Sequence, residues 1–237
     1  MRPSSPAIES NGARANTAFK RSRKPMKKTH RFGCLFIAAV IIAVTAQAQA
    51  GSVTYSAKTG SLLKISGTSS IHDWEVKTLL IGGDMVWDSS FPLDPSKVEL
   101  PKLAKVPKVN VIVPVRNIES GKQRMNEVMH GAMNAQKHKY ARYSLKEIKV
   151  AETKRKAGDP IVFDTKGTLS VNGKSVLVPM QVSIAKGVGA KLQVRGKTKL
   201  KMSQFGITPP APKIALGLIT TSDEVTVEFK WYVAPKM

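Results

Sequence analysis

The chain has 237 residues, with 38 Lys and Arg against 16 Asp and Glu, and its formal net charge is +22. Its single cysteine, Cys34, excludes an intramolecular disulfide and a thiolate-rich zinc site. Stability must therefore come from a packed core, and the strong positive charge points to anionic partners.

The N-terminal region has the layout of a secretory signal peptide. The first 31 residues carry nine Lys or Arg and one acid, and the apolar run FGCLFIAAVIIAVT follows, then the small residues AQAQAG. A basic region, a short apolar region and an A-x-A site are typical of such a signal. The apolar run is shorter than the roughly 20 residues of a spanning helix. We expect export to the periplasm or outside the cell, with cleavage after Ala48 or Ala50.

Two regions follow from this interpretation. Residues 1–50 are an N-terminal extension and cleavable signal peptide, and Met26 opens a shorter signal of the same kind that could be the true start. Residues 51–237 form one domain of ordinary length. Nine Lys or Arg and one acid lie in the first region, so the net charge of residues 51–237 is +14. Cys34 lies at the start of the apolar run and not at the cleavage site, which argues against a lipid anchor.

The dominant hydrophobic period beyond residue 51 is two, which predicts antiparallel strands with one solvated face. Residues 191–202, KLQVRGKTKLKM, alternate apolar and basic side chains in this way. Asn172-Gly173 predicts a tight hairpin between its flanking strands. In all we expect roughly nine or ten strands. They are predicted near 52–57, 61–69, 74–81, 83–88, 109–115, 141–152, 160–171, 174–184, 191–202 and 225–233.

Residues 118–138 break this alternation. Ser120 is placed to cap a helix, and four apolar side chains share one helical face: Met125, Val128, Met129 and Met133. Gly131 interrupts the pattern, so we expect one helix of about two turns and a second short one. The methionines either cover the mouth of a cavity or plug the end of the core. Tyr140 and Tyr143 are predicted in the same wall.

These elements predict an all-β domain with one short helical insertion. So many antiparallel strands must close into a barrel or stack into a sandwich, because exposed edges invite aggregation. A barrel of about eight strands is either filled by side chains or holds one small ligand. Gly167 and Gly196 fall on inward positions, where they leave room or mark bulges. The Pro-rich segments 89–108 and 207–217 are predicted loops.

Four motifs occur in an order that resembles the YceI-like family of exported, lipocalin-like barrels. They are SGTSSIHDW (66–74), the VPV-x-x-I-x-SGKQRMNEVM run (113–129), KGTLSVNGKSVLVPM (166–180), and MSQFGITPPAP with DEVTVEF (202–212 and 223–229). The resemblance covers essentially the whole chain beyond residue 50. It implies an antiparallel lipocalin-like β-barrel that encloses an apolar cavity for a polyisoprenoid or similar long-chain lipid. The chain departs from the family at Asn126, where an acid is common, and at Ala141, where a proline is.

Ser70, His72 and Asp73 have the residue types of a hydrolase triad. In an extended segment, however, Ser70 and His72 point one way and Asp73 the other, so the relay cannot form. The chain also has no G-x-S-x-G elbow around this serine. The segment is better explained as a corner held by side-chain to backbone bonds, with Trp74 opening the next inward face. We expect no catalytic residue and no enzyme.

Metal and nucleic acid are not predicted ligands. His72, His130 and His138 form no close pair and are interpreted as solvated surface residues, so neither metal nor cofactor is expected. A haem carrier would need His72 as the axial ligand. The lysines are spread over the outer face without exposed aromatic platforms, which argues against nucleic acid. They favour weak contact with an anionic membrane surface. A homodimer through a strand edge or the Pro-rich loops stays open.

The sequence thus predicts an exported, non-enzymatic protein that holds an isoprenoid or other long-chain lipid for transport, storage or sequestration. The alternative is a filled barrel that acts as an interaction or stress-protective envelope protein without lipid cargo. A continuous cavity would discriminate between them. The cavity-facing candidates are Leu63, Ile65, Trp74, Val111, Val113, Met129, Val182, Val194, Phe229 and Trp231.

Overall fold

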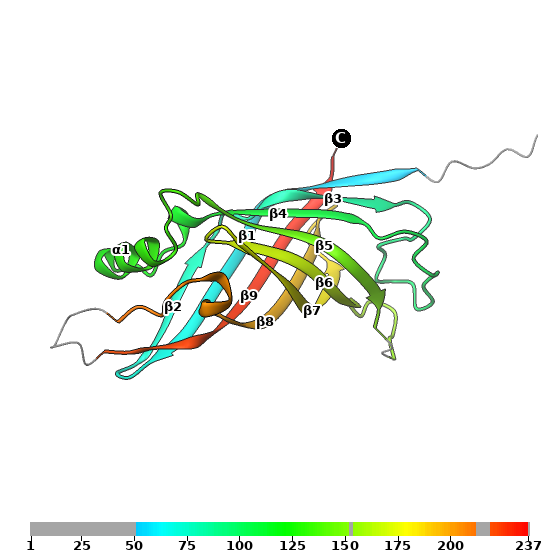
Figure 1. The fold of residues 1–237 in the computed structure, drawn as a ribbon. Helices are drawn as coiled ribbons and strands as arrows, with labels where there is room; N and C mark the ends of the chain where they lie inside the picture. Colours follow the sequence, from blue (N-terminus) through cyan, green and yellow to red (C-terminus); the bar gives the residue numbers. More distant parts are fainter. Residues whose placement is uncertain (1–50, 152–153, 212–218, 237) are drawn as a thin grey trace, which may run out of the picture. The chain divides into compact units, whose positions relative to one another are not determined.

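The computed structural model describes residues 51–151, 154–211 and 219–236. The predicted signal peptide, residues 1–50, and part of the second Pro-rich segment, 212–218, lie outside them. The described residues form nine β-strands, one α-helix and two short 3-10 helices (Figure 1). The strands are β1 Ser52–Ser69, β2 Asp73–Thr78, β3 Gly82–Asp88, β4 Lys108–Pro114, β5 Tyr140–Val150, β6 Ile161–Val171, β7 Lys174–Lys186, β8 Leu192–Lys201 and β9 Thr221–Pro235. The helices are η1 Val115–Asn117, α1 Gln123–Ala132 and η2 Met202–Phe205.

The sheet closes into a barrel, as predicted. From β3 to β9 each strand pairs antiparallel with the next, and β1 pairs with both β3 and β9, which completes a ring of eight strands. β2 lies outside this ring order and pairs with the second half of β1. The sandwich alternative does not form, because the β1–β9 pairing joins the two ends of the sheet.

The two strands predicted near 52–57 and 61–69 are one continuous strand, β1. Its register against β9 shifts between Lys58 and Leu62, which marks a bulge. Gly60 supplies the positive φ of 96°. The buried Ser61 hydroxyl donates to the Lys58 carbonyl at 3.0 Å and accepts from the Tyr232 amide at 3.0 Å. The bulge bends β1 without breaking it, so one strand can pair along both its edges.

The predicted alternation is present along β8. Leu192, Val194 and Leu200 are buried, whereas the lysines between them face outward. Lys197 pairs with Glu228 at 2.6 Å, across the outer surface of β8 and β9. The hairpin between β6 and β7 is also as predicted, with φ of 50° at Asn172 and 75° at Gly173.

The helical segment differs from the prediction. One helix, α1, runs through Gly131, and the residues after it form turns instead of a second helix. The residue at its N-cap is Lys122, and Ser120 lies two positions too early to cap it. The Ser120 hydroxyl instead donates to the Asn126 side chain at 2.8 Å. No helix of the described residues is long and apolar enough to cross a membrane.

The first Pro-rich segment closes the end of the barrel opposite α1 (Figure 1). Phe91 from this segment is 2% exposed and packs against Trp87 and Phe163, with ring centroids 5.9 and 6.1 Å away. The Trp87 and Phe163 rings lie 5.6 Å apart. Three aromatic rings therefore fill this end of the core.

Arg155 fixes that closing segment in place. Its guanidinium donates to the main-chain carbonyls of Pro95, Lys97 and Val98 at 2.6 to 3.1 Å. It also donates to the Asp159 carbonyl at 3.0 Å, within its own loop. One cationic side chain thus ties the β5–β6 loop to the β3–β4 loop, which holds the closed end together.

Candidate functional site: an apolar cavity inside the barrel

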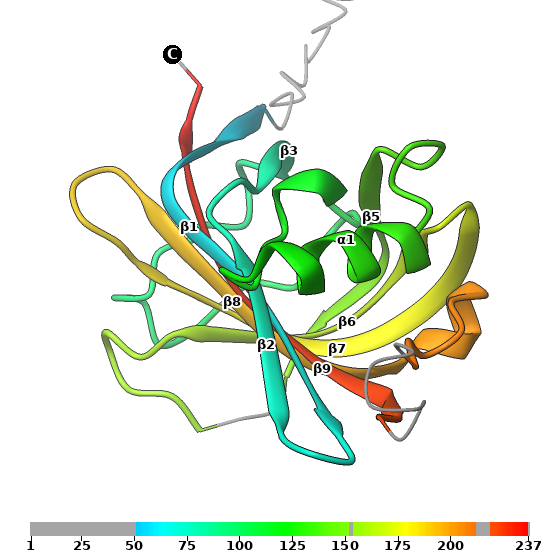
Figure 2. The same ribbon diagram turned by 90° about the vertical axis from the view of Figure 1, so that its left-hand side faces the viewer.

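The barrel encloses a cavity of about 530 Å³ between its aromatic closed end and α1. Ligand pockets commonly measure about 300–1,000 Å³. The deepest lining residues include Trp87 and Phe163, and the outermost are exposed residues beside α1, such as Ile71 and Lys122. The cavity therefore opens at the α1 end, which faces the viewer in Figure 2. We call this opening the mouth.

All ten cavity-facing candidates from the sequence lie in the cavity wall. They come from β1, β2, β4, β7, β8, β9 and α1: Leu63, Ile65, Trp74, Val111, Val113, Met129, Val182, Val194, Phe229 and Trp231. Period-two alternation places them there, because inward positions of neighbouring strands face the same interior. Which of them contact a ligand stays a prediction.

Several wall residues are not among the candidates predicted from the sequence. Phe163 and Thr165 on β6 line the cavity, as do Met85 and Trp87 on β3. Their strands show the same alternation of inward and outward side chains as the others. The same alternation therefore predicts these residues as inward-facing too. Of the two predicted wall tyrosines, only Tyr143 lines the cavity.

Tyr140 corrects that prediction. It is 45% exposed, and the Arg142 guanidinium lies 5.3 Å from the centroid of its ring. Tyr140 and Arg142 are two residues apart on β5, so their side chains share one face of the strand, whereas Tyr143 points to the other. The tyrosine at position 140 therefore belongs to the surface beside the mouth and not to the cavity wall.

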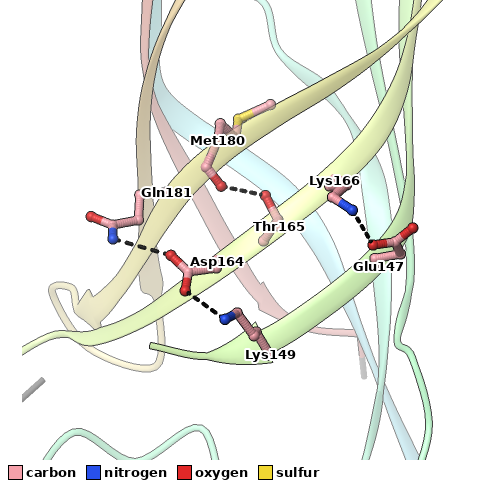
Figure 3. Close-up of polar contacts among 7 residues, drawn as sticks. All are labelled: Glu147, Lys149, Asp164, Thr165, Lys166, Met180 and Gln181. Atoms are coloured by element: carbon pink, nitrogen blue, oxygen red, sulfur yellow. Dashed lines mark hydrogen bonds and ion pairs between the residues drawn. The ribbon is translucent and has the colours of Figure 1, made fainter. Parts of the chain in front are cut away.

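Polar groups of this wall are kept away from a ligand by bonds within the sheet. The buried Thr165 hydroxyl donates to the Met180 carbonyl on the neighbouring strand at 2.8 Å (Figure 3). Charged side chains of the same strands pair with one another, as Lys166 does with Glu147 at 2.8 Å. The wall therefore presents mainly hydrocarbon to the cavity, which suits an apolar ligand.

Tyr143 is an exception within the wall. Its hydroxyl is buried and has no hydrogen-bond partner among the described residues. Burial raises the pKa of Tyr143, and the nearby Thr165 hydroxyl offsets part of that rise. Because its pKa is raised, the Tyr143 phenol stays neutral and keeps a proton that it can donate. The Nε1 groups of Trp87 and Trp231 are likewise buried without a hydrogen-bond partner in the described ranges. A ligand oxygen that reached one of these donors would remove the cost of its unpaired burial.

Two inward glycines make room for aromatic rings. A Cβ added at Gly196 would lie 2.5 Å from Cε1 of Phe229, which faces it on β9. A Cβ at Gly167 would overlap the Tyr143 ring. The β5 register also shifts opposite Gly167, so this position combines the two roles expected from the sequence. The space left by the glycines is thus taken by rings of the wall.

The helix α1 covers the mouth. Met125 and Met129 of α1 line the cavity together with Met133 at its C-cap, yet no residue of α1 is fully buried. Of the two predicted roles for the methionines, cover and plug, the cover agrees with the open cavity beneath them. His130 ties the helix to the preceding segment, since its Nε2 lies 2.9 Å from the Ile118 carbonyl oxygen.

The Ser70, His72 and Asp73 cluster forms a corner between β1 and β2, as predicted. The Ser69 hydroxyl donates to the His72 carbonyl at 2.7 Å, and Ser70 Oγ accepts from the Thr220 amide at 3.1 Å. The Nδ1 of His72 lies 2.8 Å from the main-chain oxygen of Asp73, where a triad would place its carboxylate. These hydrogen bonds fix the course of the backbone between β1 and β2 at the rim of the mouth.

Of the three histidines beyond residue 50, two are not the solvated surface residues that the sequence suggested. His130 is half-buried through its bond to Ile118, and the half-buried His138 ring packs against Gly173. His72 is exposed and lies at the rim of the cavity. No cluster of three His, Cys, Asp or Glu side chains suited to a metal occurs within the described ranges.

The closed antiparallel barrel with an internal apolar cavity defines a ligand-binding barrel of the lipocalin-like class. The YceI-like domain model matches residues 44–232, and the chain belongs to this family of binding proteins. Two solved structures share the fold. BcnA from Burkholderia cenocepacia has 19% identity and a TM-score of 0.54, over 73% of this chain and 96% of its own. A polyisoprenoid binding domain from Saccharophagus degradans, implicated in plant cell wall breakdown, has 12% identity and a TM-score of 0.55, over 78% of this chain and 99% of its own. No curated protein matches the chain.

Proposed function

We propose that this protein is an exported, non-enzymatic carrier that holds a polyisoprenoid or similar long-chain lipid in its barrel, for transport, storage or sequestration. The observation that carries the proposal is the apolar cavity that runs from the aromatic closed end to the mouth. Such a shape accepts a chain inserted end first. The filled-barrel alternative requires that this space be occupied by side chains, which the cavity argues against.

Burial of apolar surface supplies the affinity. Removing ~400 Å² of ligand surface from water contributes on the order of 10 kcal/mol. The lost freedom of the ligand offsets at least about 4 kcal/mol of this. The remainder, at most about 6 kcal/mol, corresponds to a Kd of tens of micromolar or weaker. An affinity of this order suits a carrier, because the ligand can also leave.

The chemistry of the mouth supports an amphiphilic ligand over haem. The lining there includes His72, Lys122 and Arg124, whereas the interior is apolar. A long chain would place its apolar part inside and its polar end among these rim groups. An axial haem ligand would have to face the interior, but among the described residues the only histidine in the lining, His72, lies at the exposed rim.

A cavity-filling substitution tests the proposal. Val182 lines the middle of the wall, so Val182→Trp should block the cavity and lower the affinity for farnesol or geranylgeraniol at least tenfold. Val188→Trp is the matched control, because Val188 is 87% exposed. Uptake is measured by native mass spectrometry with each variant's thermal unfolding as a check on folding. Equal uptake by the two variants, or none by the unmodified protein, would contradict the proposal.

A further inference from the structure

A group of unpaired cations lies beside the mouth. We call it the mouth patch and define it as Lys137, Lys139, Arg142 and Lys174. All four are exposed, and they come from the segment after α1, the start of β5 and the start of β7. Three of them line a second, shallower hollow of about 370 Å³ on the outer surface: Lys137, Lys139 and Arg142.

The mouth patch keeps its positive charge. No ion pair involves any of its four members within the described part of the chain, whereas lysines on the barrel wall such as Lys166 and Lys197 are paired. Carboxylates at this end are on other elements, and they include Asp73, Glu119, Glu127, Asp223 and Glu224, the last of which pairs with Lys199. Glu127 pairs with Arg124 at 3.1 Å, and Asp223 accepts two bonds from Ser203.

The patch is continuous with the mouth. Arg142 lines both the cavity and the outer hollow. The Lys174 side chain continues the row of cations along the rim toward η2. Its Nζ lies next to Gly206, the residue after η2, and would be 2.9 Å from a Cβ added there. Lys201, at the start of η2, lines the cavity as well. Positive charge therefore follows the rim from β5 to η2.

Apolar and amphipathic side chains are exposed at the same end. Ile71, at the tip of the β1–β2 corner, is 60% exposed and also lines the mouth. Tyr140, beside Arg142, is 45% exposed. Tyrosine is enriched at the level of lipid headgroups, and cations close to an anionic bilayer are attracted to it. The combination of an apolar tip, a tyrosine and unpaired cations suits that interface.

We propose that the α1 end of the barrel docks on an anionic lipid bilayer, with the mouth patch against phosphate groups and with Ile71 and Tyr140 in the interfacial layer. Docking in this orientation presents the mouth to the membrane, where an apolar ligand can pass between bilayer and cavity without crossing water. This inference rests on the proposed carrier function for its purpose, but the docking itself can be measured without any ligand.

The test compares two triple variants of equal net charge. The patch variant carries Lys137→Gln, Lys139→Gln and Lys174→Gln. The control variant carries Lys102→Gln, Lys108→Gln and Lys156→Gln, three exposed lysines at or near the closed end without ion pairs in the described ranges. Each protein, purified from cells that express the full chain, is sedimented with vesicles of phosphatidylcholine alone or mixed with phosphatidylglycerol.

We expect binding only to the mixed vesicles, and weaker binding as salt is raised. A cation at such a surface is worth about fivefold in affinity, so the patch variant should bind about a hundredfold more weakly, and the control much less so. Equal losses in both variants would mean that net charge alone acts, and absence of binding by the unmodified protein would also overturn the docking. Farnesol uptake is measured in parallel without vesicles. Lost uptake there would count against the carrier function and not against docking.

Orientation is tested with a fluorophore. In a Cys34→Ser background, Ile71→Cys and Val188→Cys place an environment-sensitive label at opposite ends of the barrel. The label at position 71 should shift to the blue with mixed vesicles, and the label at position 188 should not. A shift at position 188 alone, or equal shifts at both, would refute the proposed orientation.

Discussion

Glycines in the cavity wall set the positions of aromatic rings. At Gly196, Phe229 lies so close that a single methyl group would have to displace its ring. We therefore expect Gly196→Ala to destabilise the protein by about 1–3 kcal/mol through overpacking. It should also weaken ligand binding, because the displaced ring has the cavity to move into. Urea unfolding and farnesol titration measure the two effects.

Gly131 provides the control for this substitution. It lies within α1, and an added Cβ would meet no atom within 4 Å. Gly131→Ala should thus be neutral or stabilising, by up to about 1 kcal/mol of helix propensity. If Gly196→Ala were as harmless as Gly131→Ala, the ring contact would not constrain the wall.

The Asp223 carboxylate gives the start of β9 a dependence on pH. Hydrogen bonds from the Ser203 hydroxyl and amide, at 2.6 and 2.8 Å, lower the pKa of Asp223. Because the folded pKa is below the unfolded value of about 3.9, this contribution is present above that pH and is lost as the pH falls through the folded pKa. Asp223→Asn should remove it.

The measurement is the urea midpoint as a function of pH. We expect Asp223→Asn to be less stable than the unmodified protein at neutral pH, and the difference to shrink below about pH 4. Glu127→Gln, which alters an exposed pair on α1, controls for general charge effects. A constant difference between Asp223→Asn and the unmodified protein at all pH values would refute the assignment.

At the scale of elements, α1 is the part of the structure best placed to move. None of its residues is fully buried, and Gly121, just before it, has a φ of 78° with open space around its Cα. Replacing Met125, Met129 and Met133 by serine should raise the ligand dissociation rate about a hundredfold, since each loses roughly 1 kcal/mol of apolar contact. The barrel itself should unfold at nearly the same urea concentration.

Stopped-flow release of a bound fluorescent lipid measures that rate. The control is Gln123→Ser with Glu127→Ser, both exposed residues of α1 that do not line the cavity. Unchanged release by the methionine variant would mean that α1 does not cover the exit. A large loss of barrel stability would mean that α1 is part of the core after all.

Local sequence predicts the strands well and their ends less well. Alternation identified the inward face of β8, because a half-buried strand must alternate whatever its partners are. The break at Lys58–Ser61 looked like a turn, since Gly60 with a positive φ suits a turn and a bulge equally. The hydrogen bond from the Tyr232 amide to the Ser61 hydroxyl decides in favour of the bulge. These two residues are 171 positions apart in the sequence, so no local pattern reveals the bond. Ser120 was mistaken for a cap for a similar reason, because its partner is the Asn126 side chain.

At the scale of the whole molecule, the barrel closes through one set of contacts, and the open mouth of the cavity is formed by another. Closure depends on the long β1–β9 pairing, whereas the number of strands and their alternation predicted only that the sheet closes or stacks. The mouth depends on where the 89–107 segment and α1 pack, and no local pattern specifies those contacts. The ten wall candidates were therefore predictable, whereas the open end and the mouth patch required the structure.

Surface charge adds little to the stability of this barrel. Lys64 lies 3.5 Å from both Glu75 and Glu228, in a chain of contacts from β2 across β1 to β9. These groups raise the pKa of Lys64, mainly through the charge of Glu228, but exposed pairs contribute little free energy in water. The core and the closed backbone ladder therefore hold the fold.

The most direct test of the account is native mass spectrometry of the protein purified without detergent from the envelope of cells that express the full chain, followed by organic extraction. We predict a chain that begins at Gln49 or Gly51 with a co-purifying mass that extracts as a prenyl-chain or similar long-chain lipid. Apo protein that also fails to take up added isoprenoids would contradict the central claim that the cavity holds such a ligand.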